Sequence, residues 1–324
     1  MQQNPIQYQS YPSSSTANNE IDLREFFTAL WKGKWVIISI TVIFAIGSVI
    51  YAVKQPNIYK ADALLASAET SSNGGLSNMA GQLGGLAALA GVNIGAAEFS
   101  QADLAVQVMQ SRQFIESFIK KHDLLVPLMA AKGWDISNNK LLISNEIYDE
   151  KTQHWKREPK GMRGAQPSAQ EAYDVFLKSI LSVAQDEDSG LYTISVMHYS
   201  PYIAQTWVSW LVQDINTVMR ERAISETTQN LAYLSAQLQK TAVADMRSTF
   251  YTLIEEQTKS LMLAEVQEEF VFKIIDPAVV PEVKYKPKRA LICIGGTFLG
   301  GMLGIAIVLV GFAFRKEAHE VHTN

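Results

Sequence analysis

The sequence contains one cysteine, Cys293, in 324 residues, so no disulfide can form within the chain. Five histidines are scattered, and only His319 and His322 lie close together. Without cysteine partners, these histidines do not predict a zinc site. Lys and Arg number 28 against 32 Asp and Glu, a net charge of −4 with no basic stripe. This balance excludes a nucleic-acid partner, and we expect no metal and no cofactor.

Motifs for catalysis are also scarce. The sequence has no G-x-x-x-x-G-K-[ST] phosphate loop, no G-x-S-x-G nucleophile elbow and no H-E-x-x-H zinc motif. Asp186–Asp188 resembles a cation loop, but Asp-Ser-Gly between two strands is ordinary turn chemistry. We interpret His198 as a hydrogen-bonded structural residue. The protein is therefore predicted not to be an enzyme.

Two basic runs lie in the polar segment 149–170. His154–Arg157, which includes Trp155, and Lys160–Arg163 have the charge and the aromatic ring to contact an anionic or sugar-like ligand. The same composition is typical of a solvated loop, which is the interpretation we favour.

Charge is completely absent from two long apolar runs, Trp35–Val53 and Ala290–Phe314. At 1.5 Å per residue they extend about 28 and 37 Å, enough to cross a hydrocarbon core of roughly 30 Å. Thirty-four residues precede the first run and no small-x-small cleavage site follows it. We therefore interpret it as an uncleaved anchor rather than a secretory signal. The sequence predicts a membrane protein with one transmembrane helix near each end.

The short flanks of the two spans decide the predicted topology. Arg24, Lys32 and Lys34 precede the first span, and Arg315 and Lys316 follow the second. The 54–289 segment also carries lysines near the membrane, but long translocated domains weigh little in the positive-inside rule. Both termini are therefore expected in the cytoplasm and residues 54–289 outside it, in the periplasm of a didermic bacterium.

The N-terminal part offers two open alternatives. Residues 1–19 are uncharged and polar, which predicts a disordered tail. Glu20–Lys34 suits a short helix in the cytoplasmic interface, or a helical extension of the first span.

Asn73–Ala97 contains seven glycines; we favour a mobile loop, although Leu76, Met79, Leu83, Leu86 and Ala90 have the spacing of a helix face.

The segment between the spans mixes helix and strand signals. Ile58–Ser67 is a predicted strand, and Ser100–Lys121 a predicted helix with a Ser-x-x-Asp capping signal. Ser168–Ser179 is a predicted helix, and 180–184 with 191–199 a predicted β-hairpin. The fold class is therefore α+β: two transmembrane helices flank a periplasmic mixed α/β base with a long helical extension or hairpin.

That extension is predicted from a lack of helix breakers. Residues 202–276 contain neither Gly nor Pro, and Ser200–Pro201 is a preferred helix start. One continuous helix would be about 100 Å long, so a hairpin with its turn near Gln239–Asp245 is equally consistent. Because little other helix remains to cover Leu231, Leu234 and Leu238, we expect self-association to cover them.

The second span and the segment before it contain the clearest motif. Gly296, Gly300 and Gly304 repeat as G-x-x-x-G-x-x-x-G, which places them on one helix face. This face is expected to meet a neighbouring subunit, a partner polymerase or the first span. Prolines precede it at Pro277, Pro281 and Pro287, followed by Lys288, and we expect them to form an extended segment that sets where the span begins.

These residues resemble the Wzz-type polysaccharide co-polymerases, the chain-length determinants of bacterial surface polysaccharides. The resemblance includes Glu20–Trp35, Ser111–Leu128 (SRQFIESFIKKHDLLVPL) and the block before the second span. In that block, Lys286-Pro287-Lys288 is followed after eleven residues by Gly300-x3-Gly304. Two departures from the family pattern are a one-residue-wider proline pair, Pro277 and Pro281, and Lys286 in place of serine.

The resemblance implies regulation rather than catalysis. It implies an inner-membrane, ring-like homo-oligomer of about octamer size. Such a protein sets the modal length of a lipid-linked polysaccharide, typically lipopolysaccharide O-antigen, made by a separate membrane polymerase. One branch of the family carries a cytoplasmic tyrosine kinase. Only ten residues without tyrosine follow the second span, so we expect no fused kinase.

We weigh two other functions. The same architecture serves in capsule or exopolysaccharide export with a kinase on another chain. A two-span sensor receptor would need an output domain, for which we find no room in either tail. The expected divisions are a tail at 1–34, spans at 35–53 and 290–314, a base at 54–200, a long helix or hairpin at 201–269, a return strand and proline segment at 270–289, and a tail at 315–324.

Overall fold

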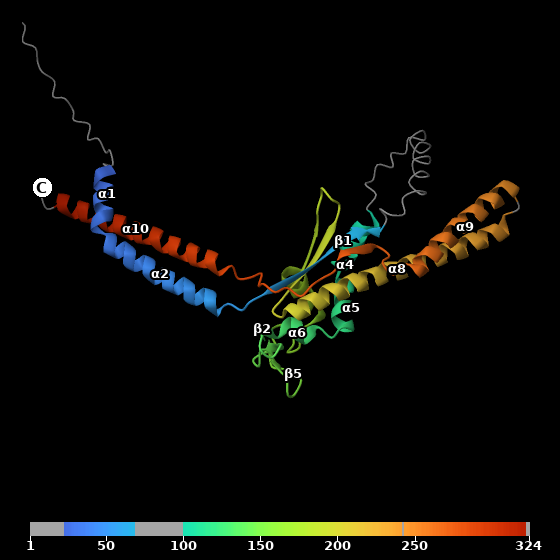
Figure 1. Cartoon of the computed structure of the whole chain (residues 1–324), viewed down its shortest axis with the longest axis horizontal. Helices are drawn as coiled ribbons and strands as arrows, with labels where there is room; N and C mark the ends of the chain where they lie inside the picture. Colours follow the sequence, from blue (N-terminus) through green and yellow to red (C-terminus); the bar gives the residue numbers. More distant parts are fainter. Residues whose placement is uncertain (1–22, 69–99, 242, 322–324) are drawn as a thin grey trace, which may run out of the picture. The chain divides into compact units, whose positions relative to one another are not determined.

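The computed structural model describes residues 23–68, 100–241 and 243–321. The chain forms two compact units (Figure 1). We call Met1–Gln55 with Lys288–Asn324 the terminal unit and Pro56–Pro287 the central unit. The predicted order or disorder of residues 1–19 and of Asn73–Ala97 lies outside the described residues.

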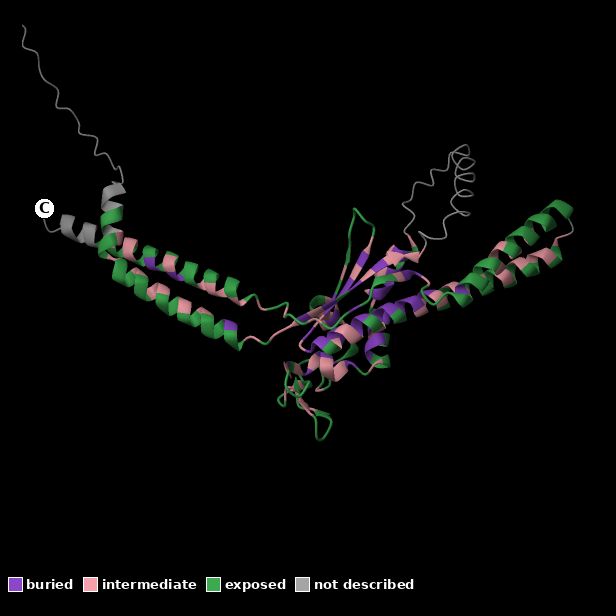
Figure 2. Cartoon of the chain, viewed as in Figure 1, coloured by how far each residue is buried: buried purple, intermediate pink, exposed green. Residues whose placement is uncertain are grey.

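The described residues of the terminal unit form three helices, α1 (Leu23–Lys32), α2 (Lys34–Lys54) and α10 (Arg289–Val321). Gly33 separates α1 from α2, so the described part of the segment before the first span is a distinct short helix. Lys34–Lys54 and Arg289–Phe312 are long and apolar enough to cross a membrane, and only 6% and 11% of their apolar windows are buried. A core helix of a soluble protein would be mostly buried, whereas most described residues of α2 and α10 are exposed or intermediate (Figure 2).

The central unit is built on a four-stranded antiparallel sheet with strand order β6-β7-β1-β8. The strands are β1 (Tyr59–Ser67), β6 (Leu181–Gln185), β7 (Tyr192–His198) and β8 (Phe272–Asp276). The central strand β1 pairs with β7 from Tyr59↔His198 to Leu65↔Tyr192, and its other edge pairs with β8. The predicted first strand, the hairpin and the return strand are all confirmed.

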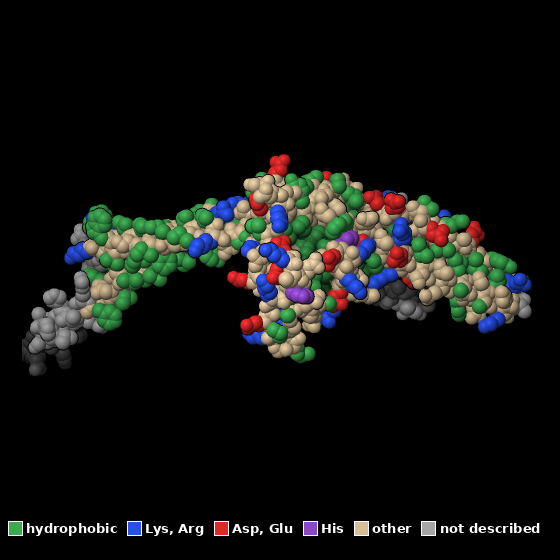
Figure 3. Space-filling view, turned by 90° about the horizontal axis from the view of Figure 1, so that it is seen from below, with side chains coloured by type: hydrophobic (Ala, Val, Ile, Leu, Met, Phe, Trp, Pro, Cys, Tyr) green, Lys and Arg blue, Asp and Glu red, His purple; other side chains and the backbone are tan. Residues whose placement is uncertain are grey.

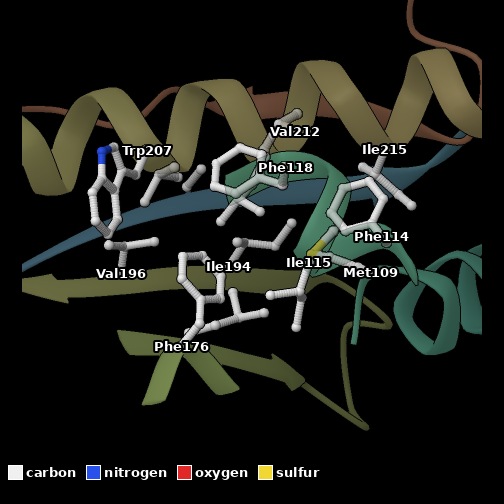
Figure 4. Close-up of a cluster of buried hydrophobic side chains, with 14 of the residues drawn as sticks. Met109, Phe114, Ile115, Phe118, Phe176, Ile194, Val196, Trp207, Val212 and Ile215 are labelled. Atoms are coloured by element: carbon white, nitrogen blue, oxygen red, sulfur yellow. The ribbon is translucent and has the colours of Figure 1, made fainter. Parts of the chain in front are cut away.

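Helices cover one face of this sheet and enclose the core. Trp207 on α8 lies above Val196, and Phe118 and Phe176 fill the space toward Ile194 (Figure 4). Each of these side chains is at most 2% exposed, so their burial supplies much of the stability of this unit. The helices are α4 (Gln101–Met109), α5 (Arg112–Lys121), α6 (Leu125–Met129), α7 (Ala169–Val175) and α8 (Pro201–Lys240).

The helix predicted over Ser100–Lys121 is two helices. Ser100 and Asp103 form the predicted capping box of α4, but Ser111 caps a new helix by accepting a hydrogen bond from the backbone N of Phe114. The helix predicted over Ser168–Ser179 ends as α7 at Val175 and continues as a π-helical turn, Phe176–Ile180. The first difference arises because a polar cap acts within an unbroken apolar pattern.

Two small hairpins were missed in the sequence. Strands β2 (Ala131–Asp135) and β3 (Lys140–Ile143) form one, and β4 (Tyr148–Asp149) and β5 (His154–Trp155) form the other. The second lies within the segment that we interpreted as a loop. Strands this short contain too few residues to show a period of two.

The long helical segment is a hairpin. Helix α8 spans 40 residues, about 60 Å, and α9 (Ala244–Val266) packs back along it. Helix α8 ends at Lys240 and α9 begins at Ala244, so the chain reverses within the predicted turn. Leu231, Leu234 and Leu238 are half-buried, so the return helix partly covers the stripe that we had assigned to self-association.

Candidate functional site: the paired membrane helices

The glycine face of α10 packs against α2. A Cβ added to Gly300 would lie 2.6 Å from the Cβ of Phe44, and one added to Gly304 would lie 3.0 Å from the Cα of Ile37. A Cβ on Gly296 would overlap the side chain of Ser48. At all three glycines, an added Cβ would lie closer to α2 than ordinary van der Waals contact, so only glycine permits this approach. Of the three partners that we considered for this face, the structure shows the first span.

The two helices also approach closely at the opposite end. Gly33, between α1 and α2, faces Val308, and any Cβ there would overlap both Cγ atoms of that valine. Sequence analysis missed Gly33, although its position just before Trp35 marks the start of the apolar run. Four glycines therefore hold α2 and α10 together from one end of the pair to the other.

The start of α10 is fixed by two sets of hydrogen bonds. The backbone O of Lys288 accepts from the backbone N of Leu291 at 3.0 Å and of Ile292 at 3.2 Å, so Lys288 is the last residue before the helix. Arg289 donates from Nε to the backbone O of Ala52 at 3.1 Å. A guanidinium at this place satisfies a carbonyl that the last turn of α2 leaves without a helical partner.

The three candidate prolines lie in the non-helical segment between β8 and α10. Pro277 is exposed, and Pro281 and Pro287 are half-buried. This segment is held within the central unit, because Ile58 donates from its backbone N to Lys286 O at 2.9 Å and accepts from Tyr285 N at 2.8 Å. The prolines therefore belong to the central unit, and α10 begins two residues after Pro287.

The polar clusters of the central unit join elements of the fold. Asp214, 7% exposed, accepts from Lys121 Nζ at 2.7 Å and lies 2.9 Å from His122 Nε2. The ring of His122 stacks on Trp210 with centroids 4.2 Å apart. This arrangement ties α5 to α8, and both carboxylate oxygens of Asp214 have a protein partner.

His198 has the structural role that the sequence predicted. Its Nδ1 accepts from the backbone N of Ser200 at 3.1 Å, so Nε2 carries the proton and donates to Pro127 O at 3.2 Å. Burial lowers the pKa of His198 to about 4, because the charged ring would lose its hydration. The neutral imidazole therefore serves as a fixed connector.

The basic segment 149–170 is also structural. Arg157 donates two hydrogen bonds of 2.9 Å to Glu171 and one of 2.7 Å to Gly164 O. The two bonds from Arg157 to Glu171 favour the charged carboxylate and lower the pKa of Glu171 to about 2. The ring of Trp155 packs edge-on against Tyr148. Arg157 and Trp155 therefore hold their own loop, and Asp186 accepts from the backbone N of Asp188 and Ser189 as turn chemistry requires.

Two parts of the chain match descriptions of known families. Residues 19–122 match the family described as Wzz, chain length determinant protein. Residues 19–122 are therefore a Wzz chain-length-determinant domain. A second match, at residues 235–311, is to GNVR, described as a G-rich domain on putative tyrosine kinase. The Wzz match includes the α2 side of the helix contact, and the GNVR match includes its glycine side. No curated protein matches this chain.

Solved structures give weak likenesses. One is described as a full-length bacterial polysaccharide co-polymerase, with 14% identity, a TM-score of 0.37, and coverage of 91% of this chain and 99% of that one. Another is a fragment of WzzB, a polysaccharide co-polymerase from Salmonella Typhimurium, with 11% identity, a TM-score of 0.28, and coverage of 71% and 100%. With TM-scores below 0.5, these likenesses add nothing to the assignment, which rests on the family match.

Proposed function

We propose that this chain sets the modal length of lipopolysaccharide O-antigen that a separate membrane polymerase makes, and that it catalyses no step itself. The observation that supports this proposal is the Wzz match over residues 19–122, which include the first span and the first part of the base. Both termini lie in the cytoplasm and residues 54–289 in the periplasm of the inner membrane. The working form is a ring-like homo-oligomer of about octamer size that contacts the polymerase and the nascent lipid-linked polysaccharide.

A second candidate is the same activity in capsule or exopolysaccharide export together with a kinase. The GNVR match favours it, because that domain is described on putative tyrosine kinases. In this case the regulated polymer is exported, and its length depends on phosphorylation.

Deleting the gene and examining the glycans distinguishes the two proposals. For an O-antigen regulator, the lipopolysaccharide ladder loses its modal cluster while polymer of unregulated length is still made. For the second candidate, the ladder is unchanged and the capsule or exopolysaccharide changes in size. Complete loss of polymer would contradict both, because it would indicate a catalytic role.

The glycine face provides a sharper test of the membrane contact. Gly300→Leu with Gly304→Leu should separate α2 from α10, because both added side chains meet atoms of α2. Length control should then shift or disappear at normal protein level. Gly311→Leu is the matched control, since a Cβ there meets nothing within 4 Å. If the double variant gives the same ladder as the control, the glycine contact has no role in length control.

A further inference from the structure

The terminal unit carries an apolar groove between α2 and α10, beside the glycine contact, with which it shares Phe44, Ser48 and Gly296. The groove has a volume of about 630 Å³. Each helix contributes a row of residues four positions apart, with a glycine in the middle. The rows are Ile43, Gly47 and Tyr51 on α2, and Leu291, Gly295 and Leu299 on α10.

Glycine makes the floor of this groove, and long side chains make its walls. A Cβ added to Gly47 or Gly295 meets nothing within 4 Å, so neither glycine is needed for helix packing. Ile43, Tyr51, Leu291 and Leu299 are 60 to 68% exposed. A groove of this composition on the lipid-facing side of two spans suits a hydrocarbon chain.

Positive charge gathers at one end of the groove. Lys54 follows Tyr51 by three residues, and Lys288 precedes Leu291 by three, so each helix row ends near a lysine. Within the described part of the chain, neither lysine forms a salt bridge. No acidic residue occurs at 48–55 or 288–295. In Figure 3, side chains along this unit are hydrophobic, and Lys and Arg appear near its ends.

We propose that the groove binds a single-chain lipid phosphate, with its hydrocarbon chain over Gly47 and Gly295 and its phosphate at Lys54 and Lys288. One channel with one cationic end matches one chain with one phosphate. The ligand class rests on the proposed function, because a regulator of lipid-linked polysaccharide meets such a lipid in the membrane. A glycan anchored here would have its lipid end held between the two membrane helices.

Photolabelling of the purified full-length chain tests this proposal, with a photoreactive polyisoprenyl monophosphate as the probe. Wild-type protein should be labelled within residues 43–51 and 291–299. Gly47→Leu with Gly295→Leu should reduce labelling by about tenfold or more, because the leucines occupy the floor. Gly311→Leu, the same change on α10 outside this groove, should leave labelling unchanged.

The charge is tested separately. Lys54→Gln with Lys288→Gln should reduce labelling about tenfold, whereas Lys32→Gln with Lys34→Gln, at the other end of α2, should not. Excess phosphatidylglycerol should compete poorly. Equal competition by this two-chain lipid, or equal labelling of the groove-filled variant, would overturn the proposal. Because labelling needs no polymerase, normal labelling together with an unaltered glycan after gene deletion would reject the proposed function and leave the groove standing.

Discussion

Asn216→Ala should release the return strand β8 from helix α8. Asn216 is 4% exposed and makes three hydrogen bonds, two to Phe272, the first residue of β8, and one to Val271, which precedes it. Its Oδ1 accepts from the backbone N of Val271 and of Phe272, each at 2.9 Å, and its Nδ2 donates to Phe272 O at 3.0 Å. Strand β8 is at the edge of the sheet, so this amide takes the place of a further strand.

The expected loss of stability follows from the number of hydrogen bonds that alanine cannot make. Each buried hydrogen bond contributes about 1 kcal/mol net, so the three together contribute roughly 3 kcal/mol. Every 1.4 kcal/mol corresponds to a factor of about ten in an equilibrium constant. Local opening of β8 should therefore become about a hundredfold more frequent.

Hydrogen exchange of the full-length chain in detergent, read by mass spectrometry over residues 268–276, measures this opening. Asn230→Ala is the matched control, because Asn230 is exposed on the same helix. Its substitution should change stability by less than about 0.5 kcal/mol. If β8 exchanges at the wild-type rate in Asn216→Ala, the amide does not hold the strand and the reasoning is wrong.

Two further predictions concern pH and topology. The pKa of His198 falls from 6.5 to about 4 on folding, so stability is full above pH 6.5 and is lost as the pH falls toward 4. The midpoint of unfolding in urea, followed by tryptophan fluorescence, should fall with pH in wild type and fall less steeply in His198→Gln. Equal dependence on pH in the two proteins would show that His198 is not the group responsible. In a Cys293→Ser background, Ser13→Cys should react only with membrane-permeant thiol reagents and Ser168→Cys also with impermeant ones, and the reverse pattern would refute the proposed topology.

The elements that sequence analysis found are those with long, uniform signals. The two uncharged runs predicted α2 and α10, and a stretch without Gly or Pro predicted the helical hairpin. The breaks that it missed depend on local hydrogen bonds between side chains and the backbone. Ser111 starts a new helix within an unbroken apolar stripe, because its hydroxyl accepts from the Phe114 backbone N. Periodicity does not show such a break.

The partner of the glycine face was not predictable for a different reason. A row of glycines shows that some backbone approaches closely, but the opposing surface is made of ordinary residues. Ile37, Thr41, Phe44 and Ser48 follow one another at intervals of four, three and four, a spacing common to any helix face. Only the three-dimensional packing distinguishes this face of α2 from its others.

Consecutive glycines on α10 have different surroundings, and this difference shows what each contributes. Gly296 faces Ser48, where a Cβ would overlap the side chain, whereas a Cβ on its neighbour Gly295 meets nothing within 4 Å. One residue of rotation is about 100° on a helix, so the two glycines point to different sides of the pair. Close approach at Gly296, Gly300 and Gly304 holds the helices together, and Gly295 with Gly47 leaves space beside that contact. Helix pairing and the groove are therefore separable by substitutions at adjacent positions.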